Sequence, residues 1–414
     1  MARTLTPQDC HVLMNLLVKE ATGQDSTIQI VDSSSFASAG ETVLATGVEN
    51  TLNALSIVLG RTFMAVRPYE AKLKIMNAIS TDGYTSRMRK ISFYAREAQE
   101  SGDWNTQLYA DNLKNGEEAI QNSGKSNTKS MWEQNQPVPI EMNFAGRDVW
   151  EESTTIYEYQ MKTVFRNESE FSDFVGAIMV EKGNDIERRK EAFNRMTLLN
   201  RMAGQYDFKE QVPAGVVNLT KAFNDEYGTN YTSAELRTTY LDQFLAFFVS
   251  TFKLYSDLMS ESTTAYHWVP EKTGYTLLRH TPKDRQRAIL YAPLFIRATA
   301  QVMPEVFNDQ YLKIENGERV NYWQNFNEPS KISVTPAIPD PTTGLQKKGD
   351  AVSLDYVVGC LYDVDALMVD FQMEDAQTTP LEARKRYRNI WWSFSKNAIN
   401  DFTENFILFT MEDA

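Results

Sequence analysis

The first apolar pattern of the chain predicts a helix that begins after Thr6 and ends near Gly23. Thr6 can cap the N-terminus, Pro7 fits the first turn, and glycine is typical just past a helix end. The apolar stripe of this helix consists of Val12, Leu13, Leu16 and Leu17. The segment 24–45 is rich in serine, threonine and β-branched residues and predicts an extended arm. A second apolar helix is predicted over 48–59.

Residues 84–137 differ in character from the rest of the chain. They are polar, with few apolar residues after Tyr109, and such a composition cannot build a packed core. On the far side, residues 157–165 alternate between apolar and polar types, which is the period of a strand. We therefore predict a long hairpin-like arm that leaves the body, returns, and reaches over a neighbouring subunit, because an excursion of about 50 residues is uncommon inside a compact monomer.

The longest predicted helix spans 168–203 and would be on the order of 50 Å long. Asn167 and Glu170 form a capping pair at its start, and Gly204 is its natural stop. A further helical block over 233–260 is densely aromatic and is expected to be buried.

The C-terminal third reads as mixed helix and strand, broken by prolines between 329 and 341. A buried strand is predicted over 352–361. The last helix is predicted to begin at Thr379 with Pro380 in its first turn. Its apolar face would consist of Tyr387, Ile390, Trp391, Phe394 and Ala398. A closing strand is predicted over 406–409, so the fold class is α+β.

Composition sets limits on size and partners. The chain has 414 residues, of which 42% are hydrophobic and 23% charged, and this length predicts two or three lobes. The formal net charge of −13 argues against a protein that wraps nucleic acid through its overall field, although it permits a wall that encloses it. Cys10 and Cys360 have no paired spacing, and reduced, packed thiols are expected. The pattern shows no secretion signal and no apolar run of about 18 residues, so we expect a soluble protein made in a cytoplasm.

Candidate chemistry is sparse. His11, His267 and His280 have no metal-ligand spacing and are expected to be structural or exposed. Gly124-Lys125-Ser126 resembles the end of a phosphate-binding loop, but Ala119 stands where the first glycine is needed. We predict no catalytic residue, no cofactor and no metal site, and the chain is not expected to be an enzyme.

Two clusters of charged residues remain to be interpreted. The carboxylates between Asp363 and Asp375 favour a solvated or salt-bridged edge, with a cation site across a subunit interface as the alternative. A basic run lies on the polar side of the predicted last helix, and contacts between subunits are favoured over nucleic-acid contact. The candidate intersubunit residues are Arg384, Lys385, Arg386 and Arg388.

This order of parts resembles the tailed-bacteriophage major capsid proteins with the HK97-like fold, first known from phage Hong Kong 97. Several stretches also resemble capsid proteins of gut-bacterial phages. They are Leu5–Asp9, Gly40–Asn50, Gly60–Tyr69, His280–Gln286, Met303–Phe307, Thr379–Trp392 and Asn400–Asn405.

The resemblance implies a division of the chain. Residues 1–60 would form the N-terminal arm, and 84–140 the extended loop that clasps an adjacent subunit. The peripheral domain would comprise 61–83 and 141–205, with the spine helix at 167–204. The axial domain would span 206–390 with an insertion at 215–265, and 391–414 would hold the end of the last helix and the closing strand.

The resemblance also implies a function. The chain would be a major capsid protein that self-assembles into the pentamers and hexamers of an icosahedral head around double-stranded DNA. Its partners would be copies of itself, a portal protein, a scaffold, and decoration or head–tail connector proteins, with no membrane. It would be located in the virion after assembly in the host bacterial cytoplasm. Some relatives crosslink through a loop lysine, and Lys90, Lys114, Lys125 and Lys129 lie in or near this loop, but no acceptor is identified and no crosslink is predicted.

Three other readings stay open from the sequence. An encapsulin-type nanocompartment shell shares the fold but would carry protein cargo in place of a genome. Another virion component, such as a tail protein, would form rings or tubes. An enzyme with a cryptic carboxylate or tyrosine site would need a concave pocket with perturbed pKa values.

Overall fold

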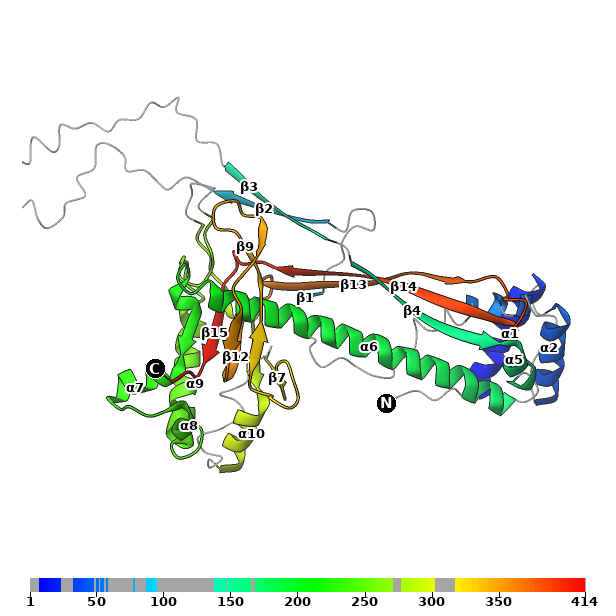
Figure 1. Cartoon of the computed structure of the whole chain (residues 1–414), viewed down its shortest axis with the longest axis horizontal. Helices are drawn as coiled ribbons and strands as arrows, with labels where there is room; N and C mark the ends of the chain where they lie inside the picture. Colours follow the sequence, from blue (N-terminus) through cyan, green and yellow to red (C-terminus); the bar gives the residue numbers. More distant parts are fainter. Residues whose placement is uncertain are drawn as a thin grey trace, which may run out of the picture.

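The structure is a computed structural model of the chain. The residues it describes are 7–23, 33–47, 50–51, 53–55, 57–58, 77–78, 87–94, 138–146, 148–164, 168–270, 277–301 and 317–413. They form an elongated α+β molecule (Figure 1), as the sequence predicts. Residues 24–32 of the predicted arm (24–45) lie outside the described residues, as do residues 84–86 and 95–137 of the polar stretch (84–137).

One helix, α6 (Glu168–Asp207), runs along the long axis and joins two bodies (Figure 1). Its 40 residues span about 60 Å at 1.5 Å per residue. Its apolar residues belong to two separate cores. Phe171, Val175 and Ile186 lie in the first, and Phe193, Leu198, Leu199 and Met202 lie in the second. The predicted long helix is confirmed, and it contributes side chains to the cores of both bodies.

The first body surrounds the N-terminal part of α6. A four-stranded sheet, in the order β1-β13-β14-β4, packs along one side of the helix. On the other flank, Phe36 of α2 makes an edge contact with Phe171 of α6, with ring centroids 5.5 Å apart. The elements are α1 (Pro7–Thr22), α2 (Ser33–Ala45), β1 (Asn77–Ala78), β4 (Asp148–Tyr157), α5 (Glu158–Val164), β13 (Leu367–Thr378) and β14 (Tyr387–Asn400).

The second body encloses the C-terminal third of α6. Its five-stranded sheet has the order β5-β15-β12-β6-β7, and α9 (Leu241–Leu258) covers one face with phenylalanines at helical spacing. The Phe248 ring lies 5.9 Å from that of Phe409 in β15, and each buried ring of this kind contributes about 1.5–3 kcal/mol through apolar burial. The other elements are β5 (Val216–Asn218), α7 (Leu219–Tyr227), α8 (Ser233–Leu236), β6 (Gln286–Tyr291), α10 (Ala292–Gln301), β7 (Gly317–Val320), β12 (Val357–Asp363) and β15 (Phe406–Thr410), with short 3-10 turns at Pro213–Gly215 and Lys283–Arg285.

Two small two-stranded sheets lie near the C-terminal end of α6. β8 (Ile332–Val334) pairs with β11 (Val352–Leu354), and β9 (Ala337–Pro339) pairs with β10 (Gln346–Lys348). A separate ribbon consists of β2 (Arg87–Tyr94) and β3 (Val138–Ala145), paired antiparallel over eight residues. Figure 1 shows this ribbon on the side of the molecule opposite to α10. The ribbon confirms that the polar excursion has strand-like roots.

The C-terminal end of α6, within the second body, is closely packed around Gly204. A Cβ atom at this position would lie 2.6 Å from the Phe402 ring and 3.3 Å from Ile338. The helix continues past Gly204 to Asp207, so the predicted stop is wrong. Glycine is required here because the Phe402 side chain crosses the helix surface at that point.

Three further predictions of secondary structure are wrong. Residues 33–45 form helix α2 where an extended arm was expected, because Phe36, Ala39 and Val43 share a buried face. Residues 158–164 form helix α5 where a strand was expected. Residues 387–400 form strand β14 where the last helix was expected, and its buried residues alternate along the strand. The end of a helix expected after 391 is therefore also strand.

Other predictions are confirmed or refined. The N-terminal helix and the closing strand are present as α1 and β15. The block 233–260 consists of α8 and α9, and Thr232 with Glu235 forms a capping box at its start. The predicted strand over 352–361 divides into β11 and β12. Strand β13 contributes to both cores, because Leu367 and Val369 at its start lie in the second core, whereas Phe371 and Ala376 pack against the first, together with Ile390, Trp392 and Phe394 of β14.

We predict that Gly204→Ala lowers the free energy of unfolding by about 1–3 kcal/mol, because the added methyl group overpacks the contact with Phe402. Helix propensity alone predicts the opposite sign, a gain of about 1 kcal/mol. Denaturant unfolding of the purified variant distinguishes the two signs. The second substitution Phe402→Leu makes room for the methyl group and should reduce the loss caused by Gly204→Ala, whereas an unchanged loss would contradict the packing explanation.

Candidate functional site

The basic run lies at the turn between β13 and β14, at the end of the molecule that also holds α1, α2 and α5 (Figure 1). Its placement on a helix is wrong, because Thr379 and Glu382 organise a turn. Thr379 Oγ1 accepts a hydrogen bond from the Asn389 N–H at 3.0 Å, and the Glu382 carbonyl accepts one from the Arg386 N–H at 2.8 Å. Arg386 has a φ of 53°, a left-handed conformation that closes the turn.

The four candidate residues differ in their surroundings. Arg386 Nη1 lies 3.1 Å from Glu158 Oε2, and the Glu158 N–H donates to the Arg386 carbonyl, so the turn is fixed to the start of α5. Arg388 is buried in β14 opposite Ile156 of β4. Arg384 and Lys385 are exposed at the tip. The run therefore presents three exposed cations, of which Arg386 is also paired with Glu158, whereas Arg388 is buried.

A second cluster of charges lies where the β2–β3 ribbon meets the body. Lys90 of β2 forms ion pairs with both Asp401 and Glu404, whose side chains are 1% and 10% exposed. Arg279 Nη2 lies 3.4 Å from Glu404 Oε1. Burial raises the pKa of Glu404, while Lys90 and Arg279 oppose that rise. Sequence reasoning missed this cluster, since the stretch 400–405 stood out only as a family resemblance.

A fully buried arginine near the C-terminal end of α6 extends this cluster of charges. The Arg201 guanidinium of α6 lies between the rings of Phe402 and Phe406, 4.1 and 4.5 Å from their centroids. It donates to Gln205 Oε1 at 2.6 Å and to the Glu404 carbonyl at 3.3 Å. Burial lowers the pKa of Arg201 to about 9, and the nearby Asp401 carboxylate opposes this effect. The side chain thus ties the shared helix to the turn that receives Lys90.

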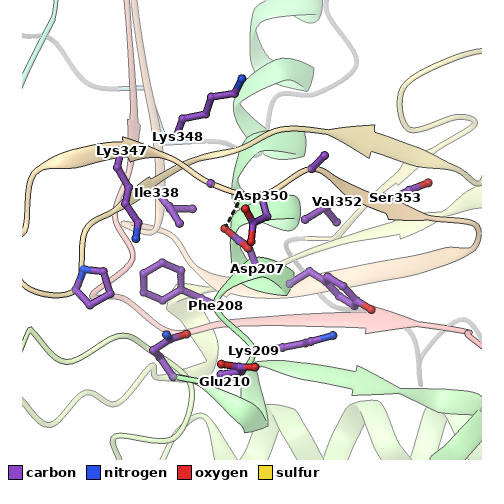
Figure 2. A pocket seen from close by; sticks show the side chains of 15 residues that line it. Asp207, Phe208, Lys209, Glu210, Ile338, Lys347, Lys348, Asp350, Val352 and Ser353 are labelled. Carbon is purple, nitrogen blue, oxygen red and sulfur yellow. Dashed lines mark hydrogen bonds between the residues drawn. The ribbon is translucent and has the colours of Figure 1, made fainter.

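A cavity of about 660 Å³ opens at the C-terminal end of α6, between residues 206–211 and the segment 347–353 (Figure 2). Asp207 and Asp350 approach each other in this view, and Asp207 Oδ2 accepts a hydrogen bond from the Asp350 N–H at 3.2 Å. Three acidic and three basic side chains line the cavity: Asp207, Glu210 and Asp350, and Lys209, Lys347 and Lys348. The charges balance, so the cavity favours neither a cation nor an anion.

The histidines and the acidic stretch have the surroundings of structural groups. His267 is buried, with Nε2 2.8 Å from the Leu277 carbonyl and Nδ1 3.1 Å from Asn405 Oδ1. His280 is exposed. Arg285 pairs with both Asp363 and Asp365, as expected of a salt-bridged edge. The described residues contain no group of three potential metal ligands. None of the helices in the described part of the chain is long and apolar enough to span a membrane.

Comparisons with known proteins show likeness at the level of structure. No protein-family model matches the chain, and no curated protein matches it either. The chain is similar to a capsid structure of Staphylococcus phage Andhra, with a TM-score of 0.48, 9% sequence identity, and coverage of 83% of this chain and 84% of that one.

Two further likenesses are of the same kind. The mature capsid of bacteriophage PhiM1 gives a TM-score of 0.41 at 10% identity, covering 84% of this chain and 88% of that one. The capsid of cyanophage Pam1 gives 0.40 at 8% identity, covering 78% and 84%. All three are phage capsid structures, the class that the sequence stretches resemble.

We predict that the fold loses stability as pH falls below about 6.5 and that His267 causes part of this loss. Burial lowers the pKa of His267 in the folded chain. The unfolded chain therefore binds a proton that the folded chain does not, and stability rises with pH across this window. Thermal unfolding of the wild type and His267→Gln at pH 7.5 and 5.5 measures the effect. The variant should show a smaller difference between the two pH values, and an equal difference would contradict the assignment.

Proposed function

We propose that this chain is a phage major capsid protein, a subunit that self-assembles into the pentamers and hexamers of an icosahedral head around double-stranded DNA. The observation that carries the proposal is the architecture of α6. A single 40-residue helix spans two bodies with separate cores, and a two-stranded ribbon lies beside them. A beam of about 60 Å with distant ends gives each subunit several separate surfaces, which a closed shell of many copies requires.

The order of elements supports the same reading. An N-terminal helical segment precedes a strand ribbon, the long helix follows, and a second body with its own sheet comes next. This is the order that the HK97-like resemblance implies. We place the peripheral domain around the first core and the axial domain around the second. The ribbon would then be the base of the extended loop.

The net charge of the chain supports the proposal that the shell encloses DNA. The net charge of −13 weakens adhesion to phosphates, so DNA could be packed inside without being held at the wall. The remaining partners would be a portal protein, a scaffold and decoration or connector proteins. Assembly would take place in the cytoplasm of the host bacterium before the particle is released as a virion.

We propose that the tip of the β13–β14 turn contacts an acidic surface of a neighbouring copy. Arg384 and Lys385 are exposed there, and the rest of the chain carries the acidic excess. Complementary charges between identical subunits fix their register and speed their encounter. Arg386 and Arg388 would support this tip from within, through Glu158 and β14.

Reversing the charge at the tip should block assembly and leave the subunit folded. We expect the double substitution Arg384→Glu and Lys385→Glu to leave the chain as single subunits or small oligomers in sedimentation velocity, under conditions where the wild type sediments as large particles. Unfolding should change by less than about 1 kcal/mol, because both side chains are exposed.

The matched control is Arg384→Lys with Lys385→Arg, which keeps both charges and should assemble like the wild type. Large particles from the charge-reversed variant would contradict the assigned contact. Loss of assembly in both double variants would mean that shape at the tip matters and charge does not.

A further inference from the structure

The β2–β3 ribbon has one face toward the body and one toward solvent. Arg89 and Ile91 of β2 are exposed, as are Glu141 and Asn143 of β3, and an ion pair of 2.8 Å joins Arg89 to Glu141 on that outer face. The alternate residues are half-buried. They are Met88, Lys90, Ser92, Met142 and Phe144. The ribbon therefore lies on the body through a definite inner face.

Three residues of the inner face meet the body within one small area. Lys90 reaches Asp401 and Glu404, Ser92 Oγ lies 3.2 Å from Arg279 Nη2, and Met142 Sδ lies 3.9 Å from Thr403 Oγ1. The receiving residues come from the turn 401–404 and from Arg279. Lys90 is the single charge that the ribbon places there, since the other two are an alcohol and a thioether.

The turn 401–404 is held by hydrogen bonds that do not involve Lys90. Asp401 Oδ1 accepts hydrogen bonds from the Thr403 N–H at 2.9 Å and from Thr403 Oγ1 at 2.7 Å. Arg201 donates a hydrogen bond to the Glu404 carbonyl, and Arg279 lies beside the Glu404 carboxylate. We call Asp401, Glu404 and Arg279 the Lys90 socket. It is an acidic site, held by hydrogen bonds within the chain, that accepts the Lys90 ammonium group.

Removing the ammonium would leave the socket in an unfavourable state. Asp401 and Glu404 are side by side and almost fully buried, so their charges repel each other and lack water. Arg279 and Arg201 supply two positive charges, but each of them has other partners, Ser92 and Gln205. Lys90 is the cation that contacts both carboxylates directly.

We propose that the insertion of Lys90 into this socket holds the β2–β3 ribbon on the body. A two-stranded ribbon is only marginally stable by itself in water. Once released from the socket, it would lose protection along both strands while the two cores remain intact. The inference concerns a single chain and holds whether or not that chain builds a shell.

Hydrogen exchange measured by mass spectrometry on the full unassembled chain tests this. Lys90→Met removes the charge and keeps an unbranched side chain that is one atom shorter. We expect exchange in 87–94 and 138–145 to become faster by about tenfold or more, with no change in β12 and β15. Lys90→Arg keeps a cation and should restore most of the protection. Arg89→Met removes an ion pair from the outer face of the same ribbon and should leave exchange near the wild-type rate.

A further variant distinguishes loss of the Lys90 contact from destabilisation by unpaired buried carboxylates. Glu404→Gln in the Lys90→Met background removes one of those charges, so it should recover thermal stability without recovering ribbon protection. Three results would overturn the inference. The first is ribbon protection that persists in Lys90→Met or in this double variant. The second is exchange that accelerates equally in the ribbon and in β12 and β15. The third is an equal effect of Arg89→Met.

Discussion

The burial of one helix in two separate cores is the constraint on which the rest of the structure depends. The two ends of α6 cannot move independently, because Phe171 anchors one end and Met202 the other. Along the way, Glu152 of β4 pairs with Lys182 of the helix at 3.0 Å. Near its C-terminal end, the helix passes under Phe402 with only a glycine between them. The relative placement of the two bodies is thereby fixed.

The C-terminal end of α6 is also connected to the β2–β3 ribbon. Arg201, from the same turn of α6 as Gly204, holds the turn that carries Asp401 and Glu404. Those carboxylates receive Lys90 from β2. The chain of contacts therefore runs from the shared helix through one buried arginine to the base of the ribbon.

The sequence predicted the α+β class and the long helix, because each depends on local periodicity or capping, whereas the alternation over 157–165 that suggested a strand at the root of the polar stretch lies mostly in helix α5. It failed at the last predicted helix for a geometric reason. Ile390 and Phe394 are four residues apart, and that spacing places two side chains on one face of a helix and also on one face of a strand. Trp391 and Trp392 distinguish the two, since 37% of the first is exposed and 1% of the second. The Lys90 socket joins residues more than 300 positions apart, and no local pattern encodes such a pairing.

The most direct test of the central claim is electron microscopy of the wild-type protein, purified alone and after coexpression with its genomic neighbours. We expect closed shells built from rings of five and six. Closed shells that hold only protein cargo would favour a nanocompartment. A monomer or small closed dimer under every condition, coexpression included, would contradict the account.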